Sequence, residues 1–288
     1  MATSRRTIWA AGWLALVVLW APGCRMLGPL SPTSGLERAI IFHPHPFPEE
    51  AWGETRGVFE DAWFESRNGA RLHGLFIDHP NPRAVALFCH GNADTVATCA
   101  ESMLLLNQRH GLAVMIFDYQ GYGRSEGRPS EQGVFDDARA ARRWLARRTG
   151  IDESQVVLMG RSLGGAVATD LAARDGARGL VLASTFDSMP SLAQTHVPLL
   201  LPNLSMTNRF DSIDKISSYR GPLLQSHGDA DRLIPIELAL DLFHASPSQQ
   251  KRFVVIPNAG HNDPTDENYR QIFDEFIESL RPVAAAPL

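Results

Sequence analysis

The chain has 288 residues, of which 44% are hydrophobic and 20% charged, and it carries a formal net charge of −5 at neutral pH. This length and composition indicate a globular protein that buries a sizeable core, and they exclude a disordered or fibrous chain. Nearly all of its cationic residues are arginines, and no long basic run occurs. A nucleic-acid partner is therefore not expected.

The first 24 residues have the order of an export signal. Residues 1–6 carry two arginines, residues 7–20 are almost wholly apolar, and small residues lead up to Cys24. This order is typical of a signal peptide, and Cys24 occupies the lipidated position of a lipobox-like sequence that Pro22 makes imperfect. An uncleaved anchor is the alternative, because the apolar stretch reaches the short end of membrane-spanning length. We expect an exported lipoprotein, tethered to a membrane and facing the periplasm or the cell exterior.

Two further cysteines, Cys89 and Cys99, raise the question of a disulfide. An oxidising compartment would allow one, but Cys89 ends a predicted strand and Cys99 falls in the next predicted helix, so their approach is not ensured. We predict two buried thiols that pack as small hydrophobic groups.

Residues 25–57 are rich in proline and show no clear periodicity. The stretch HPHPFP suits an extended segment laid across the surface of the domain. Its two histidines, His43 and His45, have no further ligand residues beside them, so we expect a strap and not a metal site. We predict no metal and no organic cofactor.

The pattern becomes regular from residue 58. Residues 58–65 and 71–78 alternate between apolar and polar, and Asn68-Gly69 between them predicts a hairpin turn. The strands that follow are short apolar runs, typical of strands buried on both faces of a parallel sheet; they span 84–89, 113–118, 156–159, 179–183, 222–227 and 253–257.

Helical patterns separate these strands. One helix is predicted over 94–110, ended by Gly111, and another over 130–148, capped by Ser130. The last helix is expected to start with Asp263 as its cap and Pro264 in its first turn, and its buried stripe comprises Tyr269, Ile272, Phe273, Phe276 and Leu280.

Strand–helix alternation after an antiparallel start predicts an α/β fold, with a mostly parallel sheet of about eight strands flanked by helices. This domain spans 58–281, and 282–288 form a flexible tail.

One strand–helix junction carries the sequence GRSLG, in which Gly160 and Gly164 stand two residues on either side of Ser162. A sharp turn at this point lifts the serine hydroxyl clear of the backbone at the carboxyl edge of the sheet, where active groups of open α/β sheets lie. Its position between a buried strand and an alanine-rich helix favours a nucleophile over an ordinary turn.

A serine hydroxyl needs a base that accepts its proton. His261 follows the last predicted strand, so it lies at the same edge of the sheet. The third residue would orient the imidazole, and the turn after strand 222–227 offers both Asp229 and Asp231; spacing alone does not separate them. The order serine, aspartate, histidine is that of α/β-hydrolases.

Backbone N–H groups must also stabilise the negative oxygen that develops during acyl transfer. One is expected from Leu163, the residue after the serine. The other is expected from Asn92, in the HGNAD loop after strand 84–89, where Gly91 allows close approach.

With these motifs the chain resembles the α/β-hydrolase superfamily over about residues 36–281. The matching motifs are IIFHP, FCHGNAD, FDYQGYGRSEG, GRSLGGAVA, HGDADRLIP and NAGHND. It is most similar to a small-lid branch of membrane-tethered acyl-protein depalmitoylases and lysophospholipid lipases. The resemblance implies that Asp231 is the acid, that Asp229 is a turn residue, and that the HGN segment provides an oxyanion donor at Asn92.

Residues 184–218 occupy the position of a lid in this family. They include VPLLLPNL, which either contacts acyl chains or packs against the domain. The segment is too short for a large helical cap.

These features predict a serine hydrolase that acts on a small-molecule acyl ester or thioester. A peptidase or an acyltransferase could use the same three residues. A non-catalytic, lipid-tethered binding protein on the same fold is the remaining alternative, because fold does not imply activity.

Overall fold

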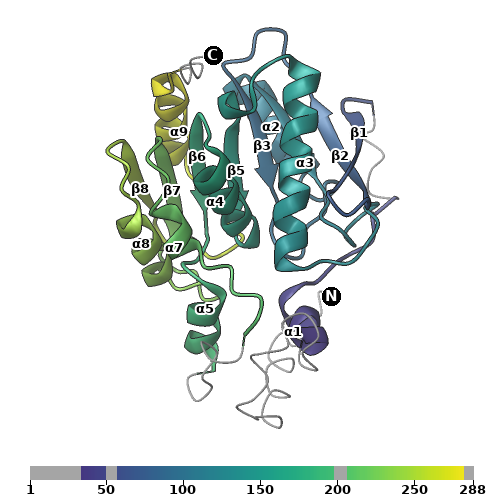
Figure 1. Cartoon of the computed structure of the whole chain (residues 1–288). Coiled ribbons are helices and arrows are strands. Elements are labelled where there is room, and N and C mark those ends of the chain that lie inside the picture. The colour runs from purple at the N-terminus through teal and green to yellow at the C-terminus, as the bar shows by residue number, and fades with distance from the viewer. Residues whose placement is uncertain (1–33, 50–56, 198–205, 282–288) are drawn as a thin grey trace, which may run out of the picture.

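The computed structural model describes residues 34–49, 57–197 and 206–281, and it shows a single sheet with helices on both faces (Figure 1). The sheet has eight strands in the order β1-β2-β4-β3-β5-β6-β7-β8. The pairs β1–β2 and β2–β4 are antiparallel, and all other neighbours are parallel. The predicted α/β fold with a mostly parallel sheet is therefore confirmed.

The strands match the predicted apolar runs closely. They are β1 (Glu60–Glu65), β2 (Arg71–Ile77), β3 (Ala84–Cys89), β4 (Leu112–Phe117), β5 (Val157–Arg161), β6 (Gly179–Ala183), β7 (Leu223–Gly228) and β8 (Lys251–Ile256). The turn between β1 and β2 contains Gly69 with φ +84°, a backbone conformation that glycine adopts without strain. Every residue of β4 is buried, as expected for an inner strand covered on both faces.

The described ranges contain the following helices, given in chain order. They are α1 (Ser34–Ile41), α2 (Ala100–His110), α3 (Glu131–Thr149), the 3₁₀ turn η4 (Glu153–Gln155), α4 (Leu163–Asp175), α5 (Met189–His196), α7 (Ser212–Ile216), α8 (Ile236–Ala245) and α9 (Glu267–Ser279). Gly111 ends α2 with φ +66°, and the Ser130 side chain caps α3 by accepting from the Gly133 N–H, as predicted.

Two hydrophobic cores lie on opposite faces of the sheet. Side chains of α3, α4 and α8, such as Phe135, Leu171 and Leu242, pack on one face. Side chains of α2 and α9, such as Met103 and Phe273, pack on the other. These layers hold the carboxyl ends of the parallel strands at one edge, where α1 and α5 also lie (Figure 1).

Three predictions about local structure were wrong. Residues 34–41 form α1 and not an extended segment. Eight residues make a marginal helix in water, but Ile41 at its end is buried in the core, so tertiary contacts stabilise it. The helix predicted from residue 94 begins at Ala100, after a series of turns.

The last helix also begins later than predicted. Asp266 is its cap and accepts from the Tyr269 N–H at 2.7 Å. Asp263 instead accepts from the Gly260 N–H at 2.7 Å, which folds the preceding loop back on itself. Both aspartates precede a helical pattern, so the choice depended on the path of that loop.

Cys89 and Cys99 are free thiols; Cys89 is fully buried as predicted, whereas Cys99 is only partly buried. Burial raises the pKa of the Cys99 thiol to about 12, so it stays protonated at neutral pH. The predicted lipid site Cys24 lies outside the described residues, as do most of VPLLLPNL and the tail. No helix among the described residues is long and apolar enough to cross a membrane.

Candidate active site

The serine of the glycine-flanked motif sits on a sharp turn between β5 and α4. Ser162 has φ +54° and ψ −124°, which non-glycine residues rarely adopt. A Cβ on Gly160 would lie 2.2 Å from the Gly164 carbonyl oxygen, and a Cβ on Gly164 would lie 2.0 Å from the Cys89 carbonyl oxygen. Both glycines are thus required by close backbone approach, which explains their spacing around the serine.

Ser162, His261 and Asp231 form one line of hydrogen-bonding groups. His261 Nε2 lies 3.2 Å from Ser162 Oγ, and His261 Nδ1 lies 2.7 Å from Asp231 Oδ2. An ionised carboxylate can only accept, so Nδ1 carries the proton and Nε2 is free to accept from the hydroxyl. The structure thereby brings together three residues that come from the ends of β5, β7 and β8.

The carboxylate of Asp231 is fixed from several sides. Its Oδ1 accepts from the backbone N–H groups of Leu233 and Ile234, both at 2.9 Å. Burial raises the pKa of Asp231, but hydrogen bonds from His227, His261 and the Ile234 backbone outweigh it and hold this pKa well below its ordinary value. Asp231 therefore stays ionised beside the imidazole.

Asp229, the alternative that spacing left open, points elsewhere. Its Oδ1 accepts from the Asn258 N–H at 2.6 Å. This contact joins the turn after β7 to the turn after β8, and it gives Asp229 a role in loop geometry.

His227 is a site residue that the sequence analysis missed. Its Nε2 lies 2.8 Å from the Ile234 carbonyl oxygen and 3.3 Å from Asp231 Oδ2. The side chain is fully buried, and it contacts the same carboxylate oxygen of Asp231 as His261 does. The signal was present in HGDAD, where a histidine stands at the end of the strand, four residues before Asp231.

The loop that carries His261 is tied to the serine turn by Arg161. The Arg161 guanidinium donates to the His261 carbonyl oxygen at 3.0 Å and also to the Asn262 side chain. Its other terminal nitrogen lies 3.8 Å from Asp94 in the HGNAD loop. A single side chain next to Ser162 thus contacts both neighbouring loops.

The two segments that carry the predicted oxyanion donors both lie next to the serine. Leu163 opens α4, where backbone N–H groups have no acceptor within the helix. The HGNAD loop runs beside Ser162, since a Cβ on Gly91 would lie 3.7 Å from Ser162 Cβ. The Asn92 side chain is engaged by His43 and Tyr122, which leaves its backbone as the group available to a substrate.

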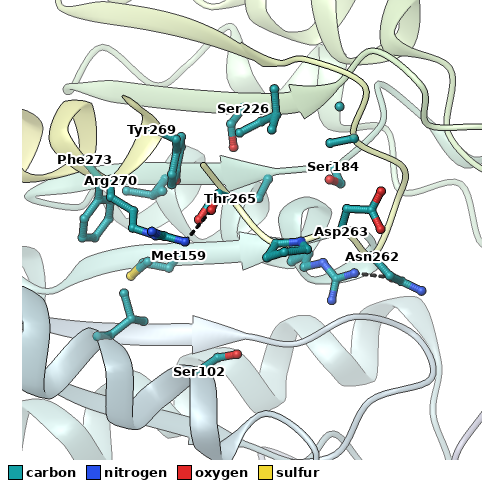
Figure 2. Close-up of a pocket in the computed structure, with 18 of the residues that line it drawn as sticks. Ser102, Met159, Ser184, Ser226, Asn262, Asp263, Thr265, Tyr269, Arg270 and Phe273 are labelled. Atoms are coloured by element: carbon teal, nitrogen blue, oxygen red, sulfur yellow. Dashed lines mark hydrogen bonds between the residues drawn. The ribbon is translucent and has the colours of Figure 1, made fainter. Parts of the chain in front are cut away.

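A pocket of about 540 Å³ lies between α2 and α9, and His261 forms part of its wall. Met159 and Phe273 line its apolar part, and Ser184, Ser226 and Tyr269 contribute hydroxyl groups (Figure 2). Ser162 is not among its lining residues, but Arg161 before the serine, His227 and His261 are, so this pocket borders the site. Within the described ranges, no group of three histidine, cysteine or acidic residues is arranged to hold a metal ion.

The predicted lid region lies at the same end of the sheet. In the part that the structure describes, it contains α5 and α7, and the Ser188 side chain caps α5 by accepting from the Ser191 N–H. Residues 207–210, which follow the gap at 198–205, are held by two carboxylates: Glu37 accepts from the Thr207 and Asn208 backbones, and Glu131 from those of Arg209 and Phe210.

Comparison with known proteins shows which family the chain belongs to. The chain is 36% identical over 250 residues to the uncharacterized protein Rv2307c of Mycobacterium tuberculosis, covering 86% of this chain and 88% of that protein. It is 34% identical over 247 residues to the alpha/beta hydrolase domain-containing protein WAV2 of Arabidopsis thaliana, covering 78% and 80%. The chain belongs to the α/β-hydrolase superfamily.

Other comparisons agree with this membership. A family model described as "Serine aminopeptidase, S33" matches residues 80–214 of this α/β-hydrolase. Its fold is similar to that of the Pyrococcus furiosus esterase Pf2001, with a TM-score of 0.64 and 17% identity over 83% of this chain and 97% of that structure. Family and fold together indicate a hydrolase, while the finer resemblance to depalmitoylases and lysophospholipid lipases stays a prediction.

Proposed function

We propose that this α/β-hydrolase is a serine hydrolase that cleaves carboxylic ester or thioester bonds through an acyl-enzyme. The observation that carries the proposal is the line from Ser162 Oγ through His261 to Asp231, with contacts of 3.2 and 2.7 Å. This is the relation that a hydroxyl nucleophile, its base and an orienting acid require.

The first half-reaction forms the acyl-enzyme. Ser162 Oγ bonds to the acyl carbon while its proton moves to His261 Nε2, and Asp231 stabilises the resulting imidazolium. The carbonyl oxygen becomes an oxyanion, which the N–H groups of Asn92 and Leu163 bind. When the bond to the leaving alcohol or thiol breaks, His261 returns the proton to that leaving group.

The second half-reaction restores the enzyme. His261 accepts a proton from water, whose oxygen bonds to the acyl carbon of the acyl-enzyme. The bond to Ser162 Oγ then breaks, the carboxylic acid leaves, and the proton on His261 returns to the serine. Besides the substrate and one water molecule, each half-reaction uses only Ser162, His261, Asp231 and the two backbone N–H groups.

A nucleophile test decides the proposal. A fluorophosphonate probe should label the wild-type protein on Ser162, and Ser162→Ala should lose labelling together with at least about 10⁴-fold in ester turnover. The matched control is Ser102→Ala, on the exposed side of α2, which should label like wild type. Labelling that survives in Ser162→Ala would refute the assignment of the nucleophile.

Peptide hydrolysis is a second candidate, favoured by the description of the matching family model. An amide leaving group would also take its proton from His261. Comparing kcat/KM for p-nitrophenyl esters with that for aminoacyl p-nitroanilides separates the two activities, because each series releases a coloured nitroaromatic product when its own type of bond is cleaved. A folded protein that turns over neither series across a broad panel would favour the non-catalytic alternative.

A further inference from the structure

The N-terminal strap, residues 42–47, crosses the edge of the sheet beside the HGNAD loop. It is anchored on both sides of His43: Phe42 and Phe47 are 3% and 7% exposed, and the Gly123 N–H donates to the His45 carbonyl oxygen at 2.9 Å. The helix before it, α1, is itself held through Glu37 to residues 207–208. His43 is therefore presented on a segment fixed at both ends.

His43 binds the side chain of Asn92 with two of its own groups. The His43 backbone N–H donates to Asn92 Oδ1 at 3.0 Å, and His43 Nδ1 lies 3.1 Å from Asn92 Nδ2. The Tyr122 hydroxyl completes the set by donating to Asn92 Oδ1 at 2.8 Å. Burial raises the pKa of Tyr122, so this hydroxyl keeps the proton that it donates.

The donors and acceptors of this cluster are consistent in only one arrangement. Asn92 Oδ1 faces two donors, so the amide nitrogen faces His43 Nδ1, and Nδ1 must accept. His43 is then the neutral imidazole with its proton on Nε2. Burial, together with the nearby His45, lowers the pKa of His43, which favours this neutral form at and above neutral pH.

We propose that His43 is a positioning residue of the oxyanion hole: it fixes the Asn92 side chain, and so aims the Asn92 backbone N–H at the substrate oxygen. This inference rests on the proposed hydrolase function. An oxyanion donor is effective only if it is oriented before the reaction. A residue 49 positions earlier in the chain supplies that orientation, so His43 is the strap residue that acts on the oxyanion hole.

The test compares three variants at the strap. His43→Ala removes the acceptor and should lower kcat by roughly 10-fold or more, with KM changed less than about threefold, because one oxyanion donor is worth about 10²–10³ in kcat. His43→Asn should recover kcat to within about threefold of wild type, since its side-chain oxygen can stand where Nδ1 stood. His45→Ala, an exposed neighbour whose backbone contact is kept, should match wild type in assays above neutral pH, where burial alone favours the neutral His43 imidazole.

A second, independent variant covers the case in which His43→Ala does not fold. Tyr122→Phe removes only the hydroxyl that donates to Asn92 Oδ1, and it should lower kcat about threefold or more with KM preserved. Thermal unfolding of each variant identifies those that are folded.

The outcomes separate this inference from the proposed function. If the wild-type protein neither hydrolyses esters nor labels with fluorophosphonate, the proposed function fails. If wild type is active and folded His43→Ala keeps its kcat, or His43→Asn is as slow as His43→Ala, the positioning role is overturned while the hydrolase remains.

Discussion

Two histidine–carboxylate pairs with nearly equal contact lengths lie in different halves of the sheet. His261 Nδ1 lies 2.7 Å from Asp231 in the parallel half, and His73 Nε2 lies 2.7 Å from Asp61 in the antiparallel hairpin. The second nitrogen of His261 faces the Ser162 hydroxyl at 3.2 Å, and its side chain is 13% exposed. The pair itself is thus common to both regions.

The surroundings of His73 exclude chemistry of the same kind. Its side chain is fully buried, and its second nitrogen lies 3.7 Å from Asp118 Oδ2. Asp118 in turn lies 3.8 Å from His90 Nε2, so the cluster connects the hairpin to the start of the HGNAD loop. An imidazole beside a carboxylate becomes a catalytic base only when its other nitrogen meets a nucleophile that a substrate can reach.

The largest effect is expected at Asp231, the carboxylate of the proposed catalytic pair. Asp231→Asn should lower kcat by roughly 10⁴-fold, because an amide favours the wrong imidazole tautomer. Asp229→Asn provides the matched control two residues away and should stay within about threefold of wild type. Steady-state ester kinetics on both proteins measure the difference, and equal losses in the two variants would contradict the assignment.

A moderate effect, on stability and not on turnover, is expected at the buried His73. His73→Gln should lower the free energy of unfolding by about 1–3 kcal/mol, since buried Asp118 loses its neighbour, and should leave kcat within about threefold. Asp61 is 53% exposed, so Asp61→Asn should cost less than about 1 kcal/mol. Urea denaturation and ester turnover measure these quantities. A folded His73→Gln protein with unchanged stability and a 10-fold lower kcat would show that His73 serves turnover and not stability, contrary to this prediction.

The smallest effect concerns acid stability. The pKa of Asp231 is held below its ordinary value of about 3.9, so on acidification the unfolded chain binds this proton first. The stability that ionised Asp231 confers is complete above about pH 5 and is lost as the pH falls towards its native pKa. The free energy of unfolding should therefore fall less steeply between about pH 5 and 3 in Asp231→Asn than in wild type. Ser162→Ala keeps the pair and should retain the wild-type slope; equal slopes in all three proteins would disprove this linkage.

Much of this architecture was predictable because its signals are local. Apolar runs identify the buried strands, and the glycines around Ser162 reflect contacts within a few residues and with the adjacent strand. The positions of residues after predicted strands, together with their order in the chain, were enough to identify His261 and two candidate aspartates. The matching family model, at residues 80–214, covers Ser162 and Asn92 but neither Asp231 nor His261.

What escaped prediction depends on contacts between distant segments. Helix α1 needs Ile41 in the core, and the start of α9 depends on how the preceding loop folds back. The contact of His43 with Asn92 joins residues 49 positions apart, and no periodic pattern in the sequence predicts it. His227 was visible but ambiguous, because a histidine before glycine suits both a turn and a buried hydrogen bond.

The separation of 99 residues between Ser162 and His261 has a consequence for biosynthesis. Contacts between such remote segments form late, because long loops must close first. During synthesis the serine turn emerges well before its base, so a partly made chain holds a hydroxyl with nothing to activate it. The proposed hydrolase would therefore become active only in the final stage of folding, once β8 and the loop that carries His261 are in place, and its activity would report completed folding.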